Sequence, residues 1–219
     1  MNPAFAHCEQ LVRDADKDRF LVTLFAPAQH RAALFALYAF NIEIARVNAA
    51  VTQVLAGEIR LQWWVEALEG KRPEEAPANP VASALIEAIA RYRLPLDPFI
   101  DIIEASRADL YKTGDVEPAL RASTALIELA ARILNDGEDP DIAELARHAG
   151  IAWSSSDDER ALRHLAEAGR LATTAPAAIM PALLPMVLVR SARAGKVLPQ
   201  WRRQWLIWRA ARDPRRIFR

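Results

Sequence analysis

The chain has 219 residues, no formal net charge and one cysteine, Cys8. Hydrophobic residues make up 52% and charged residues 26%, a globular profile, so we expect one domain spanning 1–219. Neutral charge excludes a dedicated nucleic-acid-binding protein, which needs a basic surface. A lone cysteine excludes an internal disulfide and fits a reducing compartment, and we expect Cys8 to be an unreactive helix residue. No apolar run near the N-terminus suggests a signal peptide.

Alanine, leucine and arginine outnumber β-branched residues, and apolar residues recur with helical period along almost the whole chain. We therefore predict an all-α fold of about nine or ten helices. In chain order the expected helices cover residues 8–25, 27–48, 50–68, 80–93, 95–111, 117–134, 139–153, 157–171 and 199–211, with one or two more in 171–189.

Two stretches of the sequence bear on local structure. Residues 171–189 carry no charge and approach the length of a membrane span, but Pro176, Pro181 and Pro185 interrupt them. We therefore expect a buried helix or two short ones.

Ser156 and Glu159 have the spacing of a capping box at the start of the helix expected over residues 157–171.

Several short motifs carry a family resemblance. Arg31 stands seven residues before Tyr38, which opens a Tyr-Ala-Phe sequence, and RLQWW follows at 60–64, SRADL at 106–110 and Gly-Ile-Ala at 150–152. These motifs resemble the squalene/phytoene synthase family, all-helical enzymes that join two prenyl diphosphates. The resemblance implies a single-domain helical bundle of the isoprenoid-synthase type. Parts of the family pattern after Trp153 are missing, so we expect this bundle to be shortened in its C-terminal half.

The resemblance fails at the metal site. The family's first Asp-rich motif would place carboxylates at positions 45 and 49, one helical turn apart, and this chain has Ala45 and Ala49. Glu43 lies about 200° around the helix from position 45 and so faces elsewhere. Magnesium prefers oxygen ligands, which alanine cannot supply. We predict no catalytic residue, no metal site and no cofactor, with magnesium entering only if an enzymatic alternative holds.

Five residues at motif positions could form the remnant of a prenyl-diphosphate pocket. They are Arg31, Tyr38, Arg60, Trp64 and Asp109. The structural alternative, which we favour, is that Arg31 and Arg60 pair with carboxylates such as Asp109 inside the bundle, because buried charges need partners. In that alternative Trp63 and Trp64 belong to the core.

Other polar residues give no site. Asp157, Asp158 and Glu159 form an acidic cluster, but such residues at a helix N-terminus usually cap the helix and complement its dipole. The four histidines have neither metal-ligand spacing nor an accompanying carboxylate motif. They are His7, His30, His148 and His164.

The last helix combines tryptophan with arginine. Trp201, Trp205 and Trp208 stand at i, i+4 and i+7 and so share one face. Such a face could dock on an anionic membrane surface or a protein partner, or it could pack on the domain. We favour packing for the tryptophans and assign the partner or membrane surface to the arginines near the end of the chain. These are Arg212, Arg215, Arg216 and Arg219.

The sequence after Phe40 resembles one branch of the family. It reads Asn41-Ile42-Glu43 where the enzymes have Cys-Arg, and Gln62-Trp63 fits the same branch, which lacks the Asp-rich motifs and includes mitochondrial complex I assembly factors. This resemblance implies a non-catalytic protein acting in respiratory complex assembly or another protein or membrane-surface contact, cytoplasmic or peripheral to the inner membrane. Two alternatives stay open: a prenyl-diphosphate transferase with a metal site built from other carboxylates, and a prenyl-lipid binder without turnover.

Overall fold

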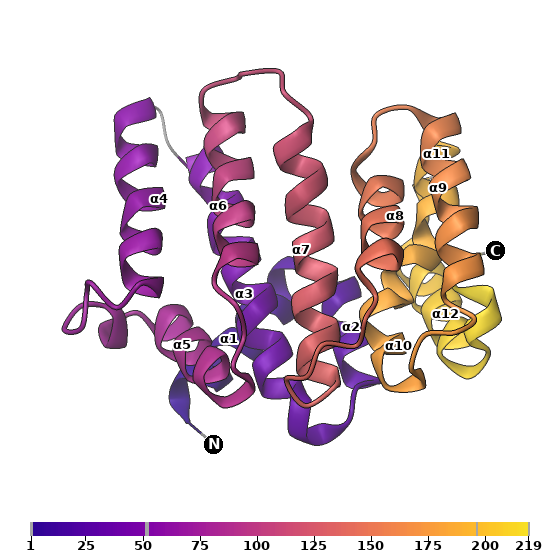
Figure 1. Cartoon of the computed structure of the whole chain (residues 1–219), viewed down its shortest axis with the longest axis horizontal. Coiled ribbons are helices and arrows are strands. Elements are labelled where there is room, and N and C mark those ends of the chain that lie inside the picture. Colours follow the sequence, from indigo (N-terminus) through magenta and orange to yellow (C-terminus); the bar gives the residue numbers. More distant parts are fainter. Residues whose placement is uncertain (1, 51–52, 196, 219) are drawn as a thin grey trace.

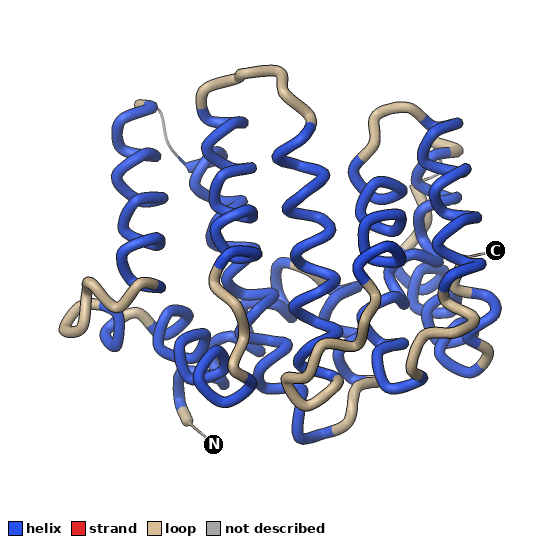
Figure 2. Tube along the Cα trace, in the orientation of Figure 1, coloured by secondary structure: helices blue, strands red, loops and turns tan. Residues whose placement is uncertain are grey.

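The computed structural model describes residues 2–50, 53–195 and 197–218, and every regular element in them is helical (Figures 1 and 2). No strand occurs in these ranges, which confirms the all-α prediction. The α-helices are α1 (Pro3–Ala15), α2 (Lys17–Leu24), α3 (Ala28–Ala50), α4 (Val54–Leu68), α5 (Pro80–Tyr92), α6 (Asp97–Leu110), α7 (Glu117–Leu134), α8 (Ala143–Ser154), α9 (Asp158–Leu171), α10 (Met180–Leu183), α11 (Val189–Arg193) and α12 (Gln200–Arg212). Short 3-10 helices are η1 (Ala76–Ala78), η2 (Ala177–Ile179), η3 (Leu184–Leu188) and η4 (Pro214–Arg216).

The longer helices stand side by side in chain order. Helices α6, α7, α8 and α9 pack each against the next, and α4 packs on α6 (Figure 1). Helix α3 lies behind them and contacts α1, α5, α6 and α7. The C-terminal helices α10 to α12 gather at the end of the molecule opposite α4. This arrangement leaves α3, α6 and α7 as the walls of the space described below.

Helix α3 is the centre of the first hydrophobic core. Its apolar residues point to several sides, and Leu34, Leu37 and Phe40 are all fully buried. The Phe40 ring meets Trp64 from α4 and Phe99 from α6 edge to face, with ring centroids 5.2 and 5.7 Å apart. Edge-to-face pairs add to the stabilisation that burial itself supplies. Packing of this kind fixes α4 and α6 against α3.

A second core lies under the C-terminal helices. Ile179, Leu183 and Ile207 are fully buried in it together with residues of α7, α8 and α9. Pro181 and Pro185 stand in the first turns of α10 and η3, where a missing N–H costs little, so the segment folds as short pieces as expected. Within the described ranges, no helix combines the length and apolarity needed to cross a bilayer.

Several helix starts differ from the sequence-based prediction. Helix α1 begins at Pro3 rather than near Cys8, and α4 begins at Val54 rather than near Ala50. Three further differences have causes visible in the structure. The first helix is broken at Asp16, whose backbone is extended and whose carboxylate caps α2 by accepting a hydrogen bond from the Arg19 N–H. Helix α8 begins at Ala143 rather than near Asp139, because Asp141 adopts a left-handed conformation with φ of 51°. Helix α9 is capped by Asp157, not by Ser156, since the Asp157 carboxylate reaches the Arg160 N–H at 2.9 Å.

The prediction that the tryptophans of α12 pack on the domain is wrong. Trp201, Trp205 and Trp208 are exposed, and the residues that α12 buries are Ile207 and Ala210. The periodicity correctly placed the tryptophans on one face. It could not show which face the domain covers, and α12 packs against η3 and α2 with Ile207 and Ala210 buried.

Candidate functional site: an apolar cleft with one carboxylate

A cleft of about 790 Å³ opens between α3, α6 and α7. Its far side is closed by the end of α8 and by α10 and η3. Most of the lining is apolar or small, with Ile44, Ile102, Leu126 and several alanines. A space of this size and character is ordinary for a small-molecule or lipid site.

Tyr38 forms part of the buried wall of the cleft. Its side chain comes from the middle of α3 and is 4% exposed, and the Arg19 guanidinium lies 5.5 Å from its ring centroid. Burial raises the pKa of the Tyr38 hydroxyl to about 12, although the Arg19 charge lowers it. The hydroxyl is therefore neutral at physiological pH and can offer only a hydrogen bond.

Two side chains hold α3 and α6 together beside the cleft. The buried Ser106 hydroxyl donates to the Ile44 carbonyl at 3.1 Å, and the Asn48 amide donates to the Ser106 carbonyl at 3.0 Å. Both bonds join groups far apart in the chain and fix the two helices in register along the wall. The Asn48 side-chain oxygen is buried without a hydrogen-bond partner in the described structure.

The two positions of the missing carboxylates face this cleft. Ala45 and Ala49 both line it, whereas Glu43 does not and pairs with Arg46 at 3.3 Å. The family's magnesium ions need several oxygen ligands on facing walls. Arg19 and Asp109 are the charged residues in the described lining, so a single carboxylate is available there. The residues present do not fit the family's metal site.

The described residues that α8 contributes to the cleft include no carboxylate, and so no second acidic motif. Trp153 and Ser154 are the α8 residues that line the cleft, and they directly follow the Gly-Ile-Ala motif at the end of this helix. Asp157 caps α9, and the Arg160 N–H lowers the pKa of its carboxyl. Throughout the described chain, no group of three or more His, Cys, Asp or Glu side chains is placed to hold a metal ion.

The structure separates the five remnant-pocket candidates. Tyr38 and Asp109 line the cleft, and Arg31, Arg60 and Trp64 do not. The Arg31 Nε atom donates to the Ala26 carbonyl at 2.8 Å near the start of α3, and Arg60 is exposed. Trp64 is buried against Phe40.

The expected pairing of these arginines with Asp109 is wrong. Neither Arg31 nor Arg60 makes an ion pair with a described carboxylate, and Asp109 is itself exposed at the cleft. Arg60 is solvated and needs no protein partner, and the half-buried Arg31 already donates to the Ala26 carbonyl, so the burial argument requires no carboxylate for either.

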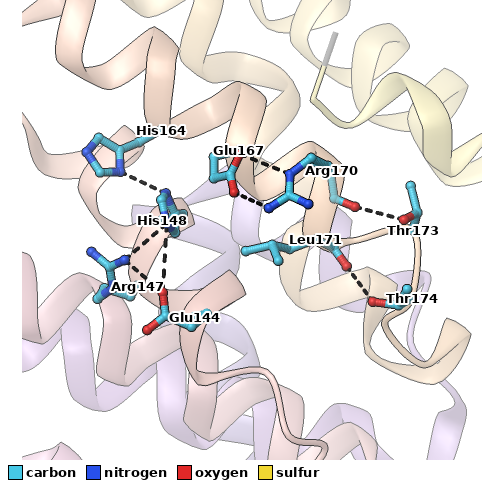
Figure 3. Close-up of polar contacts among 9 residues, drawn as sticks. All are labelled: Glu144, Arg147, His148, His164, Glu167, Arg170, Leu171, Thr173 and Thr174. Atoms are coloured by element: carbon cyan, nitrogen blue, oxygen red, sulfur yellow. Dashed lines mark hydrogen bonds and ion pairs between the residues drawn. The ribbon is translucent and has the colours of Figure 1, made fainter.

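A histidine pair between α8 and α9 could not be predicted from the spacing of the histidines in the sequence. The Nδ1 atoms of His148 and His164 lie 2.9 Å apart, and a guanidinium nitrogen of Arg147 lies 3.1 Å from His148 Nε2 (Figure 3). Arginine can only donate, so His148 Nε2 accepts and His148 Nδ1–H donates to His164 Nδ1. Burial and the neighbouring positive charges lower the pKa of His164. The pair joins two helices outside the cleft.

Cys8 is a core residue. Its side chain is fully buried in α1, and burial raises the pKa of its thiol to about 12. The thiol therefore stays protonated at neutral pH, as a packing residue rather than a nucleophile.

Comparison with known proteins decides the family. The model of the squalene/phytoene synthase family matches residues 12–155, which include α2 to α8 and most of the cleft wall. This chain belongs to the squalene/phytoene synthase family. The resemblance inferred from the motifs is thereby confirmed, and with it the isoprenoid-synthase type of helical fold.

Curated relatives fall into two groups. The chain is 33% identical over 104 residues to assembly factor 6 of NADH dehydrogenase (ubiquinone) complex I from Homo sapiens, and 36% identical over 64 residues to its homologue from Drosophila melanogaster. It is also 31% identical over 110 residues to 15-cis-phytoene synthase from Synechococcus elongatus. These matches cover 48%, 29% and 50% of this chain, and 31%, 19% and 35% of the respective relatives. The chain thus spans about a third or less of their length.

Proposed function

We propose that this protein is a non-catalytic member of its family that takes part in the assembly of respiratory complex I through contacts with proteins of that complex. The single observation that carries the proposal is the cleft. It has the size of a ligand site, while alanines line it at the two positions, Ala45 and Ala49, where the family motif would place magnesium ligands.

The chemistry of the lining supports a role without turnover. A diphosphate leaving group carries several negative charges, which must be neutralised as the bond breaks. The described lining offers the charge of Arg19 alone, and Asp109 opposes it. Similarity to the complex I assembly factors supports the assembly role. Similarity to phytoene synthase supports only membership of the same family.

Gene deletion followed by rescue tests this function. Complex I content, measured on native gels with a second respiratory complex as internal control, should fall in the deletion strain and recover with the wild-type gene. A gene carrying Asp109→Asn should rescue equally well, because a non-catalytic protein does not need that carboxylate. Unchanged complex I content after deletion would refute the proposal.

A prenyl-lipid binder is the second candidate, favoured by the apolar cleft of about 790 Å³. Saturable binding of geranylgeranyl diphosphate that is indifferent to magnesium would support this candidate. Replacing Ala105 by Trp in the same cleft should then weaken binding, because the larger side chain fills the space. The transferase alternative requires magnesium-dependent chemistry instead.

A further inference from the structure

The face of α12 that turns away from the domain carries three exposed tryptophans. At about 100° per residue, Trp201, Trp205 and Trp208 lie within about 60° of one another, roughly opposite Ile207 and Ala210. Their side chains are 68%, 46% and 44% exposed, in that order, whereas Ile207 and Ala210 are fully buried. Tryptophan is a costly residue to leave in water, so an unburied stripe of three points to a binding surface.

Positive charge is concentrated in the same part of the chain. Residues 190–219 contain ten basic side chains and one acidic side chain, whereas residues 1–189 contain 18 basic and 27 acidic ones. The net charge of zero therefore hides a strongly basic C-terminal segment. A surface that complements it must be anionic.

Two of the arginines in α12 and η4 form ion pairs with described carboxylates, and the others do not. Arg203, which points toward the domain, pairs with the buried Asp18, and Arg216 pairs with Asp213 at 3.0 Å. The other described arginines of α12 and η4 make no ion pair with a described carboxylate. They are Arg202, Arg209, Arg212 and Arg215. Arg219, which the sequence predicts on the same surface, lies outside the described residues.

Arginine and tryptophan form one combined surface on α12. The Arg209 guanidinium lies 4.4 Å from the Trp205 ring centroid, and that of Arg212 lies 4.3 Å from the Trp208 ring centroid. Each guanidinium thus stacks on an indole ring in a cation–π contact, so positive charge and aromatic surface lie side by side on the same face of the helix. We call the side chains of Trp201, Trp205, Trp208, Arg202, Arg209 and Arg212 the Trp–Arg face.

We propose that the Trp–Arg face docks on the surface of an anionic lipid bilayer. Tryptophan rings settle at the level of lipid headgroups, and arginines beside them meet lipid phosphates. Helix α12 has 13 residues, a length of about 20 Å, and lies flat against the domain, so it binds parallel to the membrane plane. This docking is independent of the proposed role in complex I assembly.

Sedimentation with vesicles tests the proposal on the purified full chain. Vesicles of phosphatidylcholine and phosphatidylglycerol in equal parts should bind the protein, and vesicles of phosphatidylcholine alone should bind it much more weakly. Replacing Arg202, Arg209 and Arg212 by Gln should weaken binding on the order of a hundredfold, about fivefold for each charge. Replacing the three tryptophans by Ala should weaken it by about tenfold or more.

Matched variants elsewhere on the surface serve as controls. Arg60, Arg91 and Arg160 are also exposed and make no ion pair with a described carboxylate, so their replacement by Gln changes the total charge equally and should leave vesicle binding unchanged. Leu55 and Ile59 are 70% and 62% exposed on α4, and their replacement by Ala controls for lost apolar surface. Circular dichroism of each variant checks that the protein is folded.

Fluorescence quenching distinguishes a bilayer from other anionic partners. Brominated acyl chains should quench tryptophan emission in the wild type and not in the triple tryptophan variant. Equal binding to neutral and anionic vesicles, full binding by the variants of the Trp–Arg face, or capture of an acidic protein by this face without vesicle binding would each overturn the proposal.

Discussion

Gly150 allows α8 to approach α7 closely at Thr124. A Cβ atom built there would lie 2.5 Å from Thr124 Oγ1 and 2.8 Å from the Thr124 backbone nitrogen. Glycine to alanine inside a helix normally stabilises by about 1 kcal/mol. We predict the opposite sign for Gly150→Ala, a loss of about 1–3 kcal/mol from overpacking, measured by urea denaturation. An equal or higher free energy of unfolding would show that the two helices can move apart freely.

His164 should make the stability of the protein depend on pH. Its pKa in the folded protein lies below the ordinary 6.5, so the unfolded chain binds more protons in acid. The associated stability is fully present above about pH 6.5 and is lost as the pH falls through the lower, folded pKa. His30, buried beside Tyr92, has a lowered pKa for the same reason and acts in the same direction.

Denaturant melts at neutral and at mildly acidic pH measure this dependence. Replacing His164 by Gln should reduce the loss of stability in acid without abolishing it, because His30 remains. Replacing His7, which is exposed on α1, by Gln should leave the loss of stability in acid as large as in the wild type. A His164→Gln protein with the same acid sensitivity as the wild type would contradict the assignment.

At the scale of elements, Arg203 ties α12 to α2 through its ion pair with Asp18. Removing the arginine leaves the Asp18 carboxylate, only 9% exposed, without its partner. We predict that Arg203→Ala lowers the free energy of unfolding by about 1–3 kcal/mol and makes α12 more sensitive to protease.

The neighbouring arginine supplies the control for this prediction. Arg202 is exposed and makes no ion pair with a described carboxylate, so Arg202→Ala should change stability by less than about 0.5 kcal/mol. Equal effects of the two substitutions would mean that the ion pair does not anchor the helix.

Most helices could be predicted from the sequence, because apolar residues recur with helical spacing and prolines stand near the helix starts. Asn79 illustrates this: its side chain caps α5 by accepting from the Val81 and Ala82 N–H groups, as the Asn-Pro pattern predicted. The break at Asp16 was missed because the apolar pattern continues through it. Periodicity also cannot choose between two faces of one helix, which is why the tryptophans of α12 were wrongly placed in the core.

At the scale of the whole molecule, the cleft shows what spacing can and cannot predict. Positions 45 and 49 were expected to share one face of α3, and both Ala45 and Ala49 line the cleft, because helix geometry alone fixes that relation. Which side chains of different helices meet there depends on packing. The motif residues Arg31 and Arg60 therefore lie outside the cleft, while Arg19 and Trp153 enter it without any sequence signal.

The proposed non-catalytic role requires that this cleft lack the ligands needed to expel diphosphate, and its described lining holds a single carboxylate. The most direct test is release of pyrophosphate from farnesyl and geranylgeranyl diphosphate by the purified protein, with and without magnesium. We predict no release above background in either condition, because alanine stands at both ligand positions of α3. Magnesium-dependent release that grows in proportion to protein concentration, and is lost in Asp109→Asn, would show that the protein is an enzyme.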